Sequence, residues 1–434
     1  MTKLPVELFA TFGVGLGVGL LLHKYALAAS SKDAITSTKG LSIEDQQDEV
    51  RRLVRPNILK LTPYRCARDD YSEGTLLDAN ENSLGPPLHD DHLLRDEGLE
   101  RYPCPYQIDL KTAVANLRQR DSSPPLEDKH VFLGVGSDEV IDLMIRIACI
   151  PRVDSILITP PTYGMYRVCA DIHDVNIIES PLVIVPPSSS TSSSENSLAS
   201  FHINPAHVRR LFPHTSRVQS VSWAKCIPGN PTANSLRVAD VETLLSSPDY
   251  NGFVVVDEAY IDFTGSSESS LAPLVTKYRR LVVTQTLSKG FGLAGIRLGI
   301  AFGDPELIQI LSNVKAPYNI NKLSSKVALD ALANVDRLHA NVRVILDEKQ
   351  KVIDALQASP YVKAVYASDS NFVLFECANA YQVYRKMAEN GVVIRYRGNQ
   401  HLLNDCLRAT IGSPEENHRM LTMFASVSAE VQQA

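Results

Sequence analysis

Two neighbouring stretches decide the fold of this chain: VVVDEAYIDF, from Val254 to Phe263, and TLSKGFGLAGIRLG, from Thr286 to Gly299. The first opens with three valines and has no polar alternation, as expected for a strand buried on both faces of a parallel or mixed sheet. Asp257 ends that apolar run, and Lys289 follows a second one. Because strand ends of this kind meet at one edge of a sheet, we expect the carboxylate and the amine to face the same site.

The surrounding sequence predicts an α/β fold. Short apolar runs alternate with amphipathic ones between residues 130 and 320, and apolar residues at helical spacing follow Ser137, which is a favourable N-cap. A long helical pattern at 322–358 then leads to strands near 371–376, 391–395 and 407–411. We therefore predict a large domain with a mostly parallel sheet covered by helices, and a smaller α+β C-terminal domain. The strand candidates of the large domain are 155–159, 218–223, 253–256, 281–286 and 298–302.

Four segments are expected along the chain. No internal repeat is visible, and the Ser-rich insert cannot bury apolar area, which predicts a solvated loop. The predicted boundaries are an extension at 1–50, an N-terminal arm at 51–84, the large domain at 85–320 with its Ser-rich insert at 187–200, and the small domain at 321–434.

Composition excludes several classes of function. Of the 434 residues, 44% are hydrophobic, which is enough for a large core. The net charge of −6 and the scattered basic residues argue against nucleic acid as a partner. The seven cysteines form no C-x-x-C pair and no Cys/His cluster with zinc spacing, so we expect no metal site and a reducing, cytoplasmic location.

The N-terminus allows three interpretations. Residues 8–22 form an apolar run interrupted by four glycines, and the run is shorter than the roughly 20 residues that span a bilayer. Glu7 and the glycines favour a disordered or loosely helical extension over a membrane anchor at 8–22, and a cleaved signal peptide is favoured least.

A lysine paired with a carboxylate at one sheet edge suits pyridoxal phosphate (PLP), whose aldehyde a lysine binds and whose ring nitrogen an acid keeps protonated. Beyond this chemistry, the chain resembles the fold-type I PLP-dependent aminotransferases, and more narrowly the histidinol-phosphate aminotransferase family. The resemblance runs from about Leu61 to Gly412. It rests on eight motifs in order: LDANENSLG, RYPCPY, GVGSDE, PPTYGMY, IPGNPTANS, VVVDEAYIDF, TLSKGFGLAGIRLG and RATIG.

The resemblance assigns roles around the cofactor. Lys289 would carry it and shuttle a proton, Asp257 would hold its ring nitrogen, and Tyr260 would assist at the ring oxygen. GVGSDE would open a helix whose N-terminus binds the cofactor phosphate. Gln285 stands where the family often has arginine, which predicts a looser loop behind Lys289. The remaining cofactor-binding residues would be Asn230, Tyr163, Gly136, Ser137, Asp138, Ser288, Arg297 and Tyr102.

The resemblance also implies a substrate site and a partner. Arg408 and Arg395 match arginines that bind anionic substrate groups, as guanidinium geometry allows. Tyr64 and Asn80 match further positions near the substrate. Tyr102 matches a tyrosine that reaches the cofactor phosphate of the neighbouring subunit, which implies a homodimer with shared active sites.

The expected activity is amino transfer between histidinol phosphate and 2-oxoglutarate, giving imidazole acetol phosphate and glutamate, in histidine biosynthesis. Two alternatives stay open on the same scaffold: a PLP-dependent decarboxylase or lyase that acts on threonine phosphate, and an aromatic amino-acid aminotransferase. A non-enzymatic, membrane-tethered protein with this fold is disfavoured, because the cofactor-binding residues are all retained.

Overall fold

The computed structural model describes most of the chain after residue 48. The described residues are 49–65, 67–70, 77–89, 92, 94, 97–187, 198–211, 221–224, 228–235, 237–248, 250–266 and 269–433. The N-terminal extension, apart from its last two residues, and most of the Ser-rich insert lie outside them. No helix in the described part is long and apolar enough to cross a membrane.

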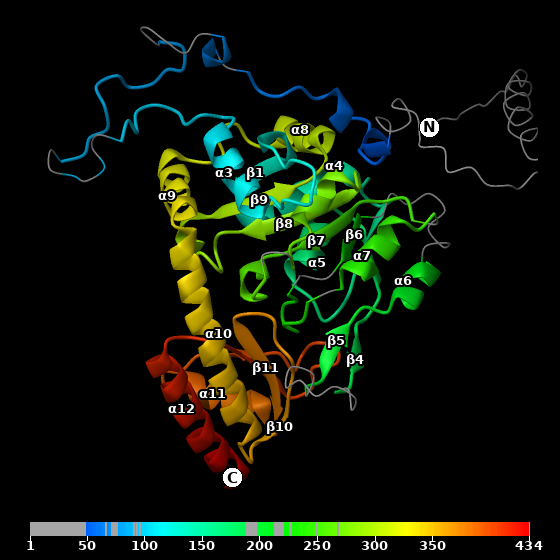
Figure 1. Cartoon of the computed structure of the whole chain (residues 1–434), viewed down its shortest axis with the longest axis vertical. Coiled ribbons are helices and arrows are strands. Elements are labelled where there is room, and N and C mark those ends of the chain that lie inside the picture. The colour runs from blue at the N-terminus through cyan, green and yellow to red at the C-terminus, as the bar shows by residue number, and fades with distance from the viewer. Residues whose placement is uncertain are drawn as a thin grey trace, which may run out of the picture. The chain divides into compact units, whose positions relative to one another are not determined.

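A mixed, mostly parallel sheet forms the centre of the larger part (Figure 1). β3, β2, β6, β7 and β8 run parallel to one another, whereas β9 runs antiparallel to both β8 and β1. In spatial order the strands are β1 (Val131–Val135), β9 (Leu298–Phe302), β8 (Leu281–Thr286), β7 (Val254–Asp257), β6 (Val221–Ala224), β2 (Ser155–Ile158) and β3 (Asn176–Glu179).

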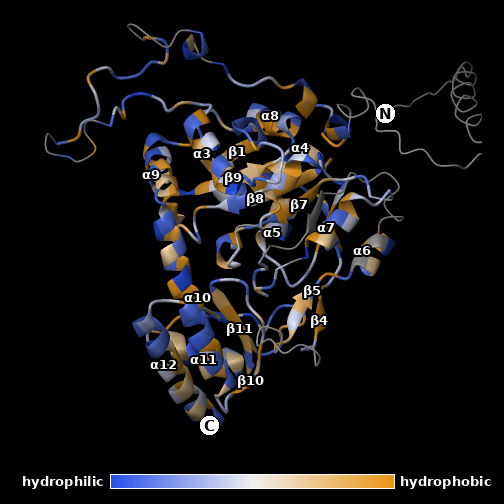
Figure 2. Ribbon diagram, viewed as in Figure 1, coloured by the Kyte–Doolittle hydropathy of each residue, from blue (hydrophilic) through white to orange (hydrophobic). Residues whose placement is uncertain are grey.

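Both faces of this sheet are buried, as the unbroken valine run predicts. Val254 and Val256 belong to one apolar cluster and Val255 to another, so alternate side chains of β7 enter two separate cores. The apolar strands appear as the central orange band in Figure 2. The helices of this part are α3 (Ile108–Arg118), α4 (Gly136–Ala148), α5 (Met165–Ile172), α6 (Pro205–Leu211), α7 (Val238–Leu245) and α8 (Pro305–Val314).

A second, antiparallel sheet lies at the C-terminal end of the chain. Its order is β10 (Val362–Val365), β11 (Phe372–Cys377), β13 (Cys406–Thr410) and β12 (Arg395–Tyr396). A third core lies between this sheet and its helices. The helices are α10 (Val335–Gln357), α11 (Ala380–Glu389) and α12 (Pro414–Gln433), and α9 (Lys322–Ala333) precedes them.

Short elements complete the described chain. β4 (Val183–Val185) and β5 (Ser200–His202) form a hairpin-like pair on either side of the insert. The 3-10 helices include Ile58–Lys60, Ala67–Asp69, Asp128–His130, Ile261–Phe263, Ala272–Thr276 and Ala294–Ile296. The α/β fold class is confirmed, while the predicted domain boundaries stay predictions.

Three local predictions were wrong. Helix α4 begins two residues earlier than expected, so Ser137 lies inside its first turn and Val135 is the N-cap. Glu139 accepts a hydrogen bond from the Val135 amide at 2.5 Å and takes over part of the capping role. The long helical stretch is broken at Asn334 into α9 and α10, and the strand expected at 391–395 is only the two-residue β12.

Candidate active site

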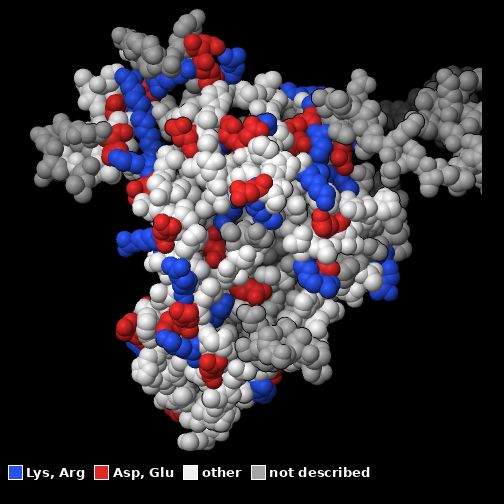
Figure 3. All heavy atoms as spheres, viewed as in Figure 1, with Lys and Arg blue, Asp and Glu red and all other residues white. Residues whose placement is uncertain are grey.

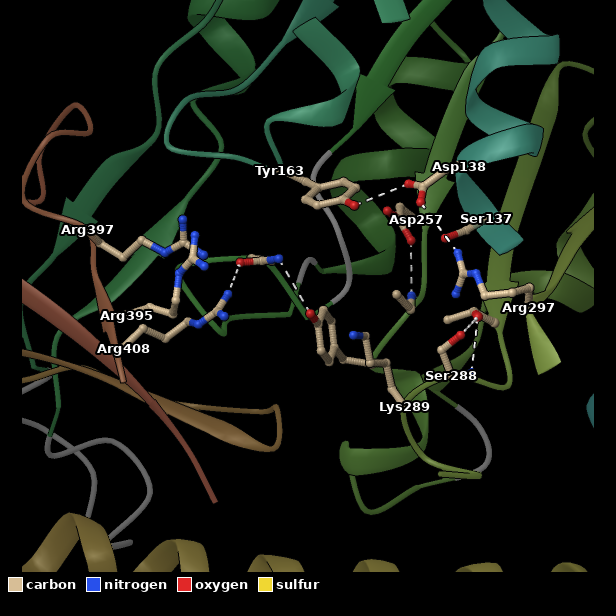
Figure 4. A pocket seen from close by; sticks show the side chains of 14 residues that line it. Ser137, Asp138, Tyr163, Asp257, Ser288, Lys289, Arg297, Arg395, Arg397 and Arg408 are labelled. Carbon is tan, nitrogen blue, oxygen red and sulfur yellow. Dashed lines mark hydrogen bonds and ion pairs between the residues drawn. The ribbon is translucent and has the colours of Figure 1, made fainter. Parts of the chain in front are cut away.

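One cavity of about 360 Å³ lies where the carboxyl ends of β7 and β8 face the small sheet (Figure 4). This size is within the range of small-molecule sites. Five cationic side chains and two carboxylates line it, so an anionic ligand is favoured. The lining residues are Ser137, Asp138, Tyr163, Asn230, Asp257, Ala259, Tyr260, Thr286, Ser288, Lys289, Arg297, Arg395, Arg397 and Arg408.

Asp257 is held firmly at the end of β7. Its side chain is 2% exposed. The Tyr166 hydroxyl donates to Oδ2 at 2.6 Å, and the Ala259 amide donates to Oδ1 at 3.1 Å. Two donors from two directions fix the plane of this carboxylate.

Lys289 follows β8 on a loop. Its Nζ lies 5.8 Å from the centre of the Tyr260 ring, and no hydrogen bond or ion pair to it is found among the described residues. The next residue must be glycine, because a Cβ on Gly290 would lie 2.3 Å from a carboxylate oxygen of Asp262. Because no described group pairs with it, the Lys289 amine is available to a ligand.

A buried polar network lies behind this loop, and it overturns the expectation that Gln285 loosens the loop. The Gln285 side chain accepts from Arg118 Nε at 2.8 Å and donates to Glu258 at 2.7 Å. Arg118 also pairs with Asp262 at 2.7 Å. Burial raises the pKa of Glu258, although its hydrogen bonds oppose that shift. The network ties α3, β7 and β8 to the segment that carries Lys289.

The N-terminus of α4 lies at the end of the cavity away from Arg395, Arg397 and Arg408 (Figure 4). Gly136 has a φ of +74°, and its amide donates to the Arg297 carbonyl at 2.9 Å. A Cβ on Gly299 would lie 2.1 Å from the Gly136 backbone, so only glycine lets β9 pass this close. Helix N-terminal amides attract negative charge.

Side chains from the β8 and β9 segments complete the end of the cavity beside α4. Ser288 receives a hydrogen bond from Thr286 Oγ1 at 2.9 Å, and both hydroxyls line the cavity. The Arg297 guanidinium is half exposed and lies 3.8 Å from Asp138, a long and weak ion pair. A helix N-terminus, two hydroxyls and a loosely held guanidinium are groups that bind a phosphate.

Aromatic and amide groups line the middle of the cavity. Tyr163 donates to Asp138 at 3.2 Å, which holds the ring across the cavity opening. Asn230 donates to the Tyr260 hydroxyl at 3.4 Å and accepts from Arg408 at 2.5 Å. Asn230 therefore connects the Lys289 side of the cavity with its arginines.

Three arginines form the far wall. Arg395 on β12 lies opposite Arg408 on β13, and Arg397 follows two residues after Arg395. Burial, together with the neighbouring charges of Arg408 and Arg395, lowers the pKa of Arg397 to about 10. Burial also lowers the pKa of Arg408.

Four predicted site residues lie outside the lining of this cavity: Gly136, the first residue of α4, and Tyr102, Tyr64 and Asn80. Tyr102 is 52% exposed and stacks on Tyr318 with ring centres 4.7 Å apart. Tyr64 is also exposed and meets the same Tyr318 ring edge-on. Asn80 adopts a φ of +55° in the arm. The contact of Tyr102 with a second chain stays a prediction, and so do the contacts of Tyr64 and Asn80 with a bound substrate.

The sequence analysis missed three residues of the site: Tyr166, Thr286 and Arg397. Tyr166 is the last residue of PPTYGMY, three after Tyr163, and Thr286 starts the lysine motif. Both residues belong to motifs already noted in the sequence, and that membership was the signal that could have identified them. Arg397 had a weaker signal, its spacing of two from Arg395, which puts both on one face of a strand.

On the face drawn in Figure 3, acidic and basic side chains are interleaved over much of the surface. The absence of a nucleic-acid partner stays a prediction. In the described residues, no group of three or more His, Cys, Asp or Glu side chains has the arrangement of a metal site.

Comparisons with known proteins identify the family. The sequence pattern of Aminotransferase class I and II matches residues 72–424. The histidinol-phosphate aminotransferase of Saccharomyces cerevisiae is 42% identical over 394 residues, which cover 87% of this chain and 97% of the yeast protein. The chain belongs to the histidinol-phosphate aminotransferase family. It is therefore an aminotransferase, as the motifs predicted.

Solved structures show the same fold. The histidinol-phosphate aminotransferase from Clostridium acetobutylicum superposes with a TM-score of 0.65 at 22% identity, over 77% of this chain and 92% of that one. The enzyme from Sinorhizobium meliloti in complex with pyridoxal 5′-phosphate gives 0.64 at 20% identity, over 81% and 90%. Fold type I is confirmed, and membership of this family implies PLP as the cofactor.

Proposed function

We propose that this chain is a PLP-dependent transaminase that converts histidinol phosphate and 2-oxoglutarate to imidazole acetol phosphate and glutamate, in histidine biosynthesis. The observation that carries the proposal is one cavity lined by both a lysine with no ion pair among the described residues and a buried, doubly hydrogen-bonded carboxylate. The family of the chain supplies the reaction class.

The residues of the cavity suit PLP in one orientation. The helix N-terminus at Gly136 and Ser137, with Asp138 beside it, and the side chains of Ser288 and Arg297 would take the cofactor phosphate. Asp257 would keep the ring nitrogen protonated, and Tyr163 would cover one face of the ring. Tyr260 and Asn230 would donate to the ring oxygen.

Bound PLP supplies an electron sink for the electrons released at the substrate carbon. Lys289 would hold the cofactor until substrate arrives, and its freed amine would then move the proton between the two carbons of the transfer. Its position beside the Tyr260 ring suits an amine that must be in turn bound and free.

The arginine wall is suited to the anionic ends of the substrates. 2-Oxoglutarate and glutamate carry carboxylates, and histidinol phosphate carries a phosphate. Arg408 and Arg395 would bind these groups by paired N–H donors. Tyr64 and Asn80 are proposed neighbours of the substrate by family resemblance.

We further propose a homodimer in which Tyr102 of one chain completes the site of the other. Support comes from its exposure and from its anchored backbone: the Tyr102 amide donates to Glu81 at 2.7 Å, and Arg101 pairs with the same carboxylate at 2.7 Å. These contacts join the RYPCPY and LDANENSLG motifs. A reducing, cytoplasmic setting accords with the five described cysteines, all free thiols.

A substrate panel tests the function. The purified, PLP-loaded enzyme should form glutamate from histidinol phosphate and 2-oxoglutarate, should work poorly with aromatic amino acids, and should release no CO₂ from threonine phosphate. Faster turnover of an aromatic amino acid, or CO₂ release without glutamate, would replace the proposal with one of the two alternatives.

A further inference from the structure

The arginine wall has an unfavourable arrangement of charge. Arg395 and Arg408 are direct cross-strand neighbours, and like charges in such a pair are destabilising. The Arg397 amide donates to the Cys406 carbonyl at 2.8 Å, which continues the pairing beyond β12. Arg397 is two residues from Arg395, and all three guanidinium groups line the same cavity (Figure 4).

Nothing in the described part of the chain neutralises these charges. No carboxylate there lies within 4.0 Å of any of the three side chains. Other cations of the small domain do pair with carboxylates, as Lys363 does with Glu376 and Arg385 with Glu389. The Nε atoms of Arg397 and Arg408 are buried without a hydrogen-bond partner. A buried donor of this kind costs free energy unless a ligand accepts its hydrogen bond.

The three arginines are not equivalent. Arg408 donates to Asn230 at 2.5 Å and lies over the Phe372 ring at 5.0 Å, so its position is fixed. Arg395 is exposed to solvent. Arg397 is partly buried and, within the described residues, makes no side-chain hydrogen bond. One fixed guanidinium is sufficient for a carboxylate, whereas a phosphate dianion has three acceptor oxygens and twice the charge.

We propose that Arg397 is a specificity-determining residue that binds the phosphate of the phosphate-bearing substrate and contributes little to the dicarboxylate substrate. This proposal rests on the proposed function and extends it. The two half-reactions would share Arg408, and Arg397 would add affinity only when the anionic group is a phosphate.

The experiment separates the two half-reactions of the PLP-loaded enzyme. Arg397→Gln keeps a polar side chain and removes the charge. We expect kcat/KM for histidinol phosphate to fall by roughly 10- to 100-fold, because a charge-assisted bond is lost. For glutamate, we expect a change below about 3-fold. Arg385→Gln is the matched control, since it removes an exposed arginine on α11 that pairs with Glu389 and does not line the cavity, and it should alter neither value.

A binding measurement gives a readout independent of turnover. Inorganic phosphate should protect the wild-type holoenzyme against thermal unfolding more than acetate does, and Arg397→Gln should remove that difference. If Arg397→Gln does not fold, Arg397→Lys retains the charge without the planar fork and should show a smaller loss confined to the phosphate substrate.

The outcomes are distinguishable. Equal losses for both substrates, or no loss for histidinol phosphate, would overturn the role of Arg397. If the wild type does not use histidinol phosphate at all, the proposed function fails. The comparison of phosphate with acetate then decides about Arg397 alone: a preference for phosphate that depends on Arg397 supports the role, and its absence overturns it.

Discussion

At the level of single residues, Asp257, the proposed partner of the cofactor ring, is oriented by a neighbour whose role its motif does not reveal. Tyr166 is 91 residues away in the chain, and its hydroxyl contacts Asp257 at 2.6 Å. Asp257 ends β7 and Lys289 lies three residues after β8, so both were predictable from the strands, whereas Tyr166 depends on how α5 turns towards the sheet. Local sequence does not specify that turn.

Tyr166→Phe tests this orienting role. Losing a hydrogen bond to a charged group should lower kcat on the order of 10-fold and leave the cofactor bound. The measurement is kcat together with the absorbance of bound cofactor. Tyr250→Phe is the control, because it removes an equally buried hydroxyl that donates to the Phe253 carbonyl at 2.7 Å, outside the cavity. Equal kcat for Tyr166→Phe and wild type would contradict the role.

At the level of elements, helix α10 positions the loop that carries Asn230. Lys349 on α10 donates to the carbonyls of Ser368 and Ser370 at 2.8 and 3.0 Å. Between them, Asp369 accepts from the Ser235 amide at 2.7 Å, and its own amide donates to the Ala233 carbonyl. A buried lysine thus connects the long helix with the substrate side of the site.

Lys349 predicts a pH dependence of stability. Burial lowers its pKa from 10.5 to about 8. Between these values the unfolded chain binds more protons than the folded one, so the free energy of unfolding should rise with pH, by on the order of 2–3 kcal/mol from this group. Urea unfolding from pH 7.5 to 10.5 should show this rise relative to Lys349→Met. Parallel curves for the two proteins would contradict it.

The elements themselves were predictable to different degrees. β7 and β9 follow from apolar runs, and β8 begins with one, as expected for strands buried on both faces of a sheet. The start of α4 was missed since Glu139, rather than Ser137, caps it. The break at Asn334 and the two-residue β12 were missed because pairing and packing with distant segments set those boundaries.

At the level of the whole molecule, the proposed shared site makes a prediction about mixed dimers. Lys289→Ala and Tyr102→Ala homodimers should each have low activity. If Tyr102 serves the partner's site, a mixed dimer has one intact site of two, so the purified mixed dimer should show roughly half of wild-type activity. Differently tagged chains, co-expressed and purified for both tags, allow the assay. Activity no higher than the average of the two parents would show that sites are not shared.

The most direct test of the account concerns the covalent attachment of the cofactor. The purified protein should be yellow, and borohydride should fix the cofactor mass on the peptide that contains Lys289. The Lys289→Ala protein should bind PLP without covalent labelling and should transfer no amino group. Labelling of a different lysine, or a wild-type protein that stays colourless after PLP is added, would contradict the central claim.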